Sequence, residues 1–101
     1  MKASFLDNIT FNEDKPKLEL LYQTDHNKEV RLSFKNGQHM KKHQSPYPIS
    51  VMVVQGEIDF GLPDKRHVLK QGDVISVEGK VLHDLIANQE SVVRLTIHLK
   101  K

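Results

Sequence analysis

The sequence predicts an all-β fold, either a sandwich or a barrel. Apolar and polar residues alternate with a period of two in several short runs, and turns rich in glycine, proline and asparagine separate these runs at regular intervals. No segment carries the period of a convincing helix. A chain of 101 residues has room for one modest core, so we expect a single domain.

Residues 1–16 show neither a helical nor a strand period and are predicted to form an N-terminal arm. Four large apolar residues lie here among acidic and amide side chains: Phe5, Leu6, Ile9 and Phe11. Because an exposed cluster of this kind is unusual, we expect the arm to pack on the barrel wall or to reach a partner subunit. Residues 17–101 are predicted to form the β-barrel domain.

Two half-buried strands are expected first, over residues 17–23 and 30–35, because apolar side chains recur there at every second position. The turn-forming residues Asp25 and Asn27 lie between them and predict a hairpin. Asn36 and Gly37 mark a second turn, since both tolerate the positive φ of tight hairpins.

The segment from Ser45 to Pro48 is expected to be extended, because each proline disfavours the helical conformation in the residue before it. Residues 49–55 are apolar at nearly every position, which predicts a strand covered on both faces. Gly56 ends this strand. Further strands are predicted over residues 57–60, 67–70, 74–77, 81–87 and 92–99, with turns between them.

Two stretches, residues 37–56 and 72–83, carry a resemblance to a known family. Gly37, five intervening residues, His43 and then Gly56 resemble the first half of the cupin signature, G-x5-H-x-H-x3,4-E-x6-G. Gly72 and His83 resemble the second half, G-x5-P-x-G-x2-H. The resemblance covers roughly residues 30–99 and implies a cupin-like jelly-roll β-barrel that forms a homodimer.

The resemblance carries over only part of the family's metal site. His43 and His83 fall on two of the four ligand positions, whereas Ser45 replaces the second histidine and Ile49 replaces the glutamate. Two other signature positions also differ: the proline and the glycine of the second half are Glu78 and Lys80. The resemblance therefore implies two inward-pointing imidazoles with an incomplete set of metal ligands.

The candidate ligand pocket follows from these positions. A period of two from Ile49 places Val51 and Val53 on the same inward face, so the pocket would be largely apolar. Its expected residues are His43, Ser45, Ile49, Val51, Val53 and His83.

The two imidazoles have two interpretations, which the sequence leaves open. They are hydrogen-bonded polar residues in this cavity, or they hold a divalent metal such as zinc, nickel or iron weakly. His39 would be a third ligand only through a sharp bend, because four residues of extended strand span about 13 Å. Asp84 is expected to point away from His83, since adjacent strand residues face opposite sides.

Three functions are consistent with this pattern. The first is a small barrel that binds an unidentified small molecule between His43 and His83. The second is a metal-dependent enzyme of the dioxygenase, isomerase or decarboxylase class, which the resemblance implies. The third is a non-catalytic dimeric structural module. The fold by itself does not choose a substrate.

Composition argues against several other functions. The chain has no cysteine, so disulfides and thiolate metal sites are excluded, and no serine lies in a G-x-S-x-G setting. The 15 basic and 13 acidic side chains are nearly balanced and the lysines are scattered, which argues against nucleic-acid binding. The longest apolar run, residues 51–54, is far too short for a membrane helix, and no secretory signal is recognisable. We therefore expect a cytoplasmic protein.

Overall fold

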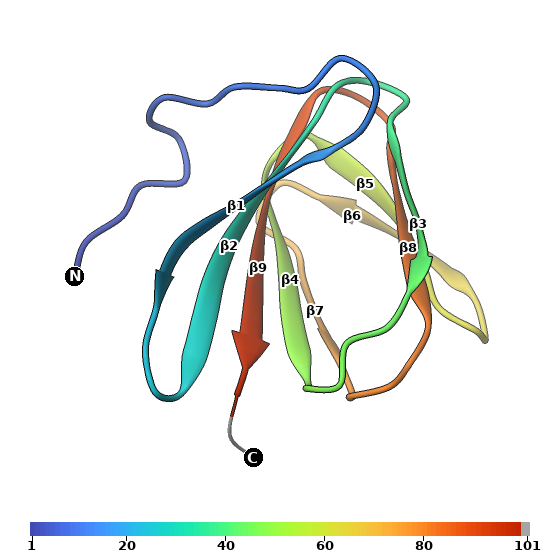
Figure 1. Ribbon diagram of the computed structural model, residues 1–101. Helices are drawn as coiled ribbons and strands as arrows, with labels where there is room; N and C mark the ends of the chain where they lie inside the picture. The colour runs from blue at the N-terminus through green and yellow to red at the C-terminus, as the bar shows by residue number, and fades with distance from the viewer. Residues whose placement is uncertain (100–101) are drawn as a thin grey trace.

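The structure, a computed structural model, describes residues 1–99. Within this range the chain forms nine strands and no helix, which confirms the predicted all-β class (Figure 1). No helix in the described chain could therefore cross a membrane. The strands are β1 (Lys17–Gln23), β2 (Asn27–Phe34), β3 (His39–His43), β4 (Ile49–Gln55), β5 (Glu57–Gly61), β6 (Arg66–Lys70), β7 (Val74–Val77), β8 (His83–Ala87) and β9 (Ser91–His98).

The strands form two antiparallel sheets that face each other across a common core (Figure 1). The larger sheet has the order β1-β2-β9-β4-β7, and the smaller one has the order β3-β8-β5-β6. From β2 onward the chain passes repeatedly between the sheets, so strands distant in sequence become neighbours. The pairing of β3 with β8 is the one that builds the candidate site.

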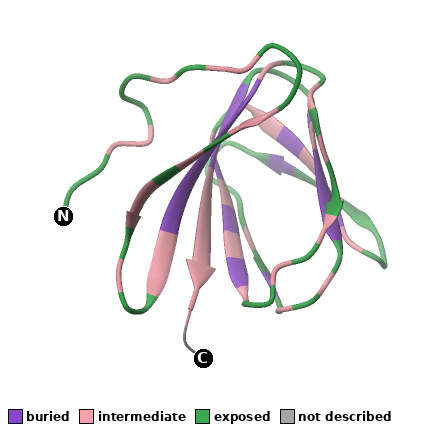
Figure 2. Ribbon diagram, viewed as in Figure 1, coloured by how far each residue is buried: buried purple, intermediate pink, exposed green. Residues whose placement is uncertain are grey.

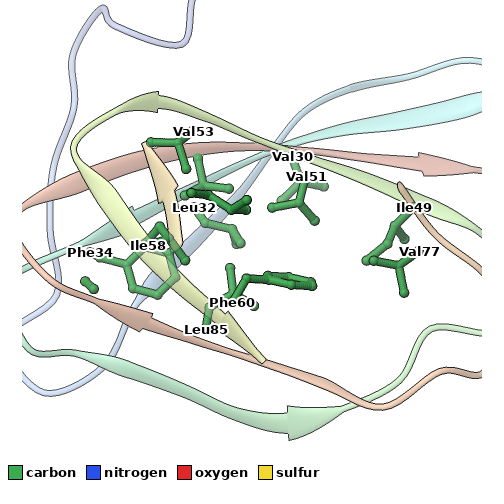
Figure 3. Close-up of a cluster of buried hydrophobic side chains, with 13 residues drawn as sticks. Val30, Leu32, Phe34, Ile49, Val51, Val53, Ile58, Phe60, Val77 and Leu85 are labelled. Atoms are coloured by element: carbon green, nitrogen blue, oxygen red, sulfur yellow. The ribbon is translucent and has the colours of Figure 1, made fainter. Parts of the chain in front are cut away.

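The core lies between the two sheets. It is formed by every second residue of the strands, the one whose side chain faces inward. In β4, Ile49, Val51 and Val53 are buried, whereas the residues between them are partly exposed. Figure 2 shows this alternation along the strands, and Figure 3 shows the packed side chains. Phe34 and Phe60 are completely buried members of this cluster. The interior is therefore closely filled with apolar side chains.

Gly56 joins β4 to β5 and shows why this turn uses glycine. Its φ is +97°, in the left-handed region that residues with a Cβ atom adopt at a cost. A Cβ atom there would also lie 2.3 Å from Ser91 Oγ and 2.5 Å from the Glu90 carbonyl oxygen. The turn thus requires glycine both for its conformation and for the close approach of the β8–β9 connection.

The N-terminal arm contacts the outer face of the larger sheet through Arg31 of β2. Arg31 Nη1 donates to the carbonyl oxygen of Asp7 at 2.8 Å, and Nε donates to Glu19 Oε1 at 3.1 Å. Longer bonds reach further arm carbonyls, those of Ser4, Phe5 and Asn8. Because Arg31 is buried, these acceptors replace the water that its charge would otherwise require.

Candidate functional site

The structure brings His43 and His83 together. His43, the last residue of β3, lies directly opposite His83, the first residue of β8. Their ring centroids are 4.3 Å apart with the rings inclined at 68°. On the core side, the Phe60 ring stacks on His83 with a centroid separation of 5.7 Å and an angle of 14°. The buried His83 ring is thus held between a phenylalanine and a second imidazole.

A β-bulge in β3 determines which histidines meet. Met40 pairs with Leu85 and His43 with His83, so two residues of β3, Lys41 and Lys42, oppose the single residue Asp84. One extra residue inverts the alternation of side chains beyond it.

His39, before the bulge, consequently lies on the other face of the smaller sheet from His43. There its Nε2 is 3.0 Å from Asp84 Oδ2. The structure therefore separates His39 from the pair formed by His43 and His83, and it turns Asp84 away from that pair.

Backbone carbonyls fix the same tautomer in both rings of the pair. His43 Nδ1 donates to the Lys41 carbonyl oxygen at 2.7 Å, and His83 Nδ1 donates to the Val81 carbonyl oxygen at 2.9 Å. A carbonyl oxygen only accepts, so Nδ1 carries the proton and Nε2 of the neutral ring keeps its lone pair. Each neutral imidazole can thus accept a hydrogen bond, or ligate a cation, through Nε2.

Burial keeps His83 neutral. Desolvation lowers the pKa of His83 below its ordinary value, and proximity to His43 lowers it further. The hydrogen bond to Val81 and the negative charge of Asp84 oppose these effects without reversing them. His83 is accordingly an acceptor rather than a cation at neutral pH.

The remaining predicted pocket residues supply no third metal ligand. Ser45 is half-buried, and its Oγ accepts a hydrogen bond from the Tyr47 amide at 3.1 Å. Ile49, Val51 and Val53 pack into the apolar core (Figure 3). Among residues 1–99, no group of three or more His, Cys, Asp or Glu side chains could hold a metal ion. Because even a catalytic zinc normally has three protein ligands, the side chains described here do not fit a tightly bound metal.

A cavity of about 160 Å³ lies beside His83, which forms part of its wall. The other predicted pocket residues do not line it: His43, Ser45, Ile49, Val51 and Val53. Its lining crosses all four strands of the smaller sheet in order: Lys42 of β3, His83 and Asp84 of β8, Gly61 of β5 and Arg66 of β6. The wall is completed by three residues of the adjoining turns, Leu62, Pro63 and Leu82.

Sequence reasoning missed Lys42, Gly61 and Arg66. No local pattern marks them, because Gly61 and Arg66 converge through the pairing of β5 with β6 and β8, and Lys42 through the bulged pairing of β3 with β8. The relevant register places Gly61 opposite Arg66 on one side and opposite Asp84 on the other.

Arg66 and Asp84 form a two-point ion pair at this cavity. Arg66 Nη1 donates to Asp84 Oδ1 at 3.0 Å, and Nη2 donates to Asp84 Oδ2 at 2.8 Å. These bonds, followed by the bond from His39, lower the pKa of the Asp84 carboxyl against the opposing effect of burial. They also raise the pKa of Arg66, as does Asp59. The pair is therefore charged across the physiological range.

Comparisons with known proteins agree with this architecture. A family model described as a cupin domain matches residues 30–98. No curated protein sequence matches the chain.

Several solved structures share the fold. An RmlC-like cupin protein from Desulfovibrio desulfuricans is 24% identical with a TM-score of 0.89, covering 97% of this chain and 96% of that one. An RmlC-like cupin from Shewanella frigidimarina is 20% identical with a TM-score of 0.81, covering 97% and 90%. KdgF from Halomonas sp. is also 20% identical, with a TM-score of 0.83 and coverage of 95% and 93%. At these identities the likeness establishes the jelly-roll fold alone.

Proposed function

The chain belongs to the cupin family, and on this premise we propose that it binds a small molecule in the cavity beside His43 and His83. The observation that carries the proposal is a cavity whose wall includes His83, the ring that contacts His43, with both imidazoles held in one tautomer. Binding sites are typically concave and largely apolar, with a few positioned polar groups. The cavity is smaller than the roughly 300–1,000 Å³ of drug-sized pockets, so the proposed ligand has only a few heavy atoms.

The neighbours of the imidazole pair support a binding role. The hydrogen bonds from both Nδ1 atoms restrict rotation of the rings, and stacking on Phe60 restricts His83 further. Little side-chain entropy would then be lost when a ligand binds. A hydroxyl or amide group of the ligand would donate to an Nε2 lone pair.

A divalent cation is a weaker candidate ligand for the same pair. Two imidazoles completed by water would release zinc, nickel or iron readily, since only two protein donors hold it. Elemental analysis of protein purified without chelators should find much less than one metal ion per chain. A stoichiometric metal that disappears in both His43→Ala and His83→Ala would instead favour the metal-dependent enzyme.

The proposed function can be tested by recording the imidazole NMR resonances of His43 and His83 during titration with a library of small alcohols, amides and acids. We expect at least one compound to shift both rings saturably. His83→Ala should abolish this binding, whereas His26→Ala, a change in an exposed turn, should preserve it. A folded protein whose paired rings respond to no compound would contradict the proposal and leave the structural module as the better interpretation.

A further inference from the structure

The β-bulge of β3 places a free cation at the rim of the cavity. Lys41 and Lys42 share the bulge, and only Lys42 contributes to the cavity lining. Within residues 1–99, none of the ion pairs involves Lys42. Its ammonium group is therefore available to a ligand.

Arg66 contributes a second donor. A guanidinium has five N–H groups, and Arg66 uses four of them on Asp59 and Asp84. The fifth, on Nη1, has no acceptor among the described residues. Arg66 Nη1 occupies the space that a side chain at position 61 would fill, because a Cβ atom on Gly61 would lie 2.3 Å from it. The missing side chain at Gly61 thus gives Arg66 its place in the cavity wall.

Asp84 contributes little free negative charge to the same wall. Both of its oxygens accept hydrogen bonds, from Arg66 and from His39, and the residue is only 4% exposed. The cavity therefore offers one unpaired ammonium and one spare guanidinium N–H, with no free carboxylate opposing them. Leu62, Pro63 and Leu82 form apolar walls, which suit a short hydrocarbon chain on the ligand.

We infer that the ligand of this cavity is a small carboxylate with a short apolar chain, whose anionic group binds Lys42 and Arg66. The inference rests on the proposed function and deepens it by naming the chemical class of the ligand. Charge-assisted hydrogen bonds from an ammonium and a guanidinium favour a carboxylate over a neutral amide of equal size. The limited volume restricts the ligand to about the size of butanoate. Butanoate itself has no donor for an imidazole Nε2, so as a probe it reports the contacts with Lys42 and Arg66 and not the contact with the imidazoles.

The test compares butanoate with butanamide, which have nearly the same shape and differ in charge. Each is titrated into ¹⁵N-labelled full-length protein at constant ionic strength while the amide resonances of Lys42, Leu82 and His83 are followed. Butanoate should shift these resonances saturably and bind about fivefold or more tightly than butanamide. Lys42→Gln should weaken butanoate binding by a similar factor of about fivefold. Lys41→Gln, which changes the neighbouring lysine of the bulge, should leave it unchanged.

Equal binding of the two compounds, with no effect of Lys42→Gln, would overturn the carboxylate inference but leave the proposed binding function intact. Equal losses in Lys42→Gln and Lys41→Gln would also overturn it, because they would indicate only general attraction to a basic strand. If neither compound shifts the cavity resonances, the inference is wrong. The titration of the imidazole pair with uncharged compounds then decides separately whether the proposed function survives.

Discussion

Lys80 occupies a backbone conformation that glycine adopts more easily. Its φ is +66°, and it stands at the position where the cupin signature has its second-half glycine. The Lys80 amide donates to the Ser45 carbonyl oxygen at 2.6 Å, so this turn is fixed against the segment that follows β3. The turn at this position thus requires a positive φ, which favours glycine. In this chain Lys80 adopts that conformation at a cost in strain.

Replacing Lys80 with glycine should stabilise the fold. Relief of the left-handed strain is worth about 1–2 kcal/mol, and the greater freedom of glycine in the unfolded chain offsets about 0.5–1 kcal/mol of it. We expect Lys80→Gly to raise the free energy of unfolding by roughly 0.5 kcal/mol, measured by urea denaturation. Lys80→Ala keeps the Cβ atom and should give no gain. Equal stability changes in the two variants would refute the explanation.

The lowered pKa of His83 makes stability depend on pH in a definite direction. The unfolded state takes up a proton near the ordinary pKa of 6.5, whereas the buried ring of the folded state resists protonation. The unfolded state then binds more protons, so the free energy of unfolding should fall as the pH drops below 6.5. Urea denaturation from pH 8 to pH 5 should show this fall, and His83→Gln should reduce its slope. If His83→Gln leaves the pH dependence of the free energy of unfolding unchanged, groups other than His83 cause it.

At the scale of single residues, the sequence predicted the pair of imidazoles but not their surroundings. The spacing of His43 and His83 from the signature glycines identified both positions. Lys42 and Arg66 lie outside the signature, and their contribution depends on a bulge and on strand register. Neither is encoded in a short motif, so the cavity emerged only from the structure.

Among the elements, β3 was the least predictable. Its sequence, HMKKH, shows no alternation of apolar and polar residues, because the bulge places two lysines opposite one partner residue. The other strands were all predicted, although β2 begins at Asn27, a predicted turn residue, and β8 begins at His83 and not at residue 81. β4 and β5 run over Ile49–Gln55 and Glu57–Gly61, against predictions of 49–55 and 57–60. Period-two patterning identifies regular strands and fails where a bulge interrupts them.

The turns offer a matched test of what their glycines do. Gly56 and Gly72 both have positive φ, at +97° and +89°, but only Gly56 is crowded by a neighbouring backbone. Gly72→Ala should therefore cost only the conformational penalty of about 1–2 kcal/mol. Gly56→Ala should cost about 3 kcal/mol or more, because its Cβ atom would also force the β8–β9 connection away. Equilibrium denaturation measures both, and similar losses in the two variants would contradict the close approach at Ser91.

At the scale of the molecule, the two sheets cover each other unevenly. Leu18 and Leu20 of β1 pair with Leu32 and Val30 and so face the inward side of the larger sheet. They are nevertheless 60% and 54% exposed, although their partners on β2 are buried. β1 is also an edge strand, with one side of its backbone unpaired. An apolar edge of this kind is normally protected by a bulge, a charge or a partner. The bulge of β1 lies between Leu20 and Tyr22, beyond both exposed leucines.

We propose that a second copy of the chain pairs with this edge to form a homodimer. Antiparallel pairing of two β1 strands about a twofold axis would continue the larger sheet and bury both leucines of each copy. Leu18→Lys combined with Leu20→Lys should shift the protein from dimer to monomer in sedimentation equilibrium. Val74→Lys, at the 62% exposed Val74 on the opposite edge strand β7, should leave the dimer intact. A wild-type chain that remains monomeric at high concentration would show that β1 is tolerated as a free edge, and dissociation by Val74→Lys alone would move the interface to β7.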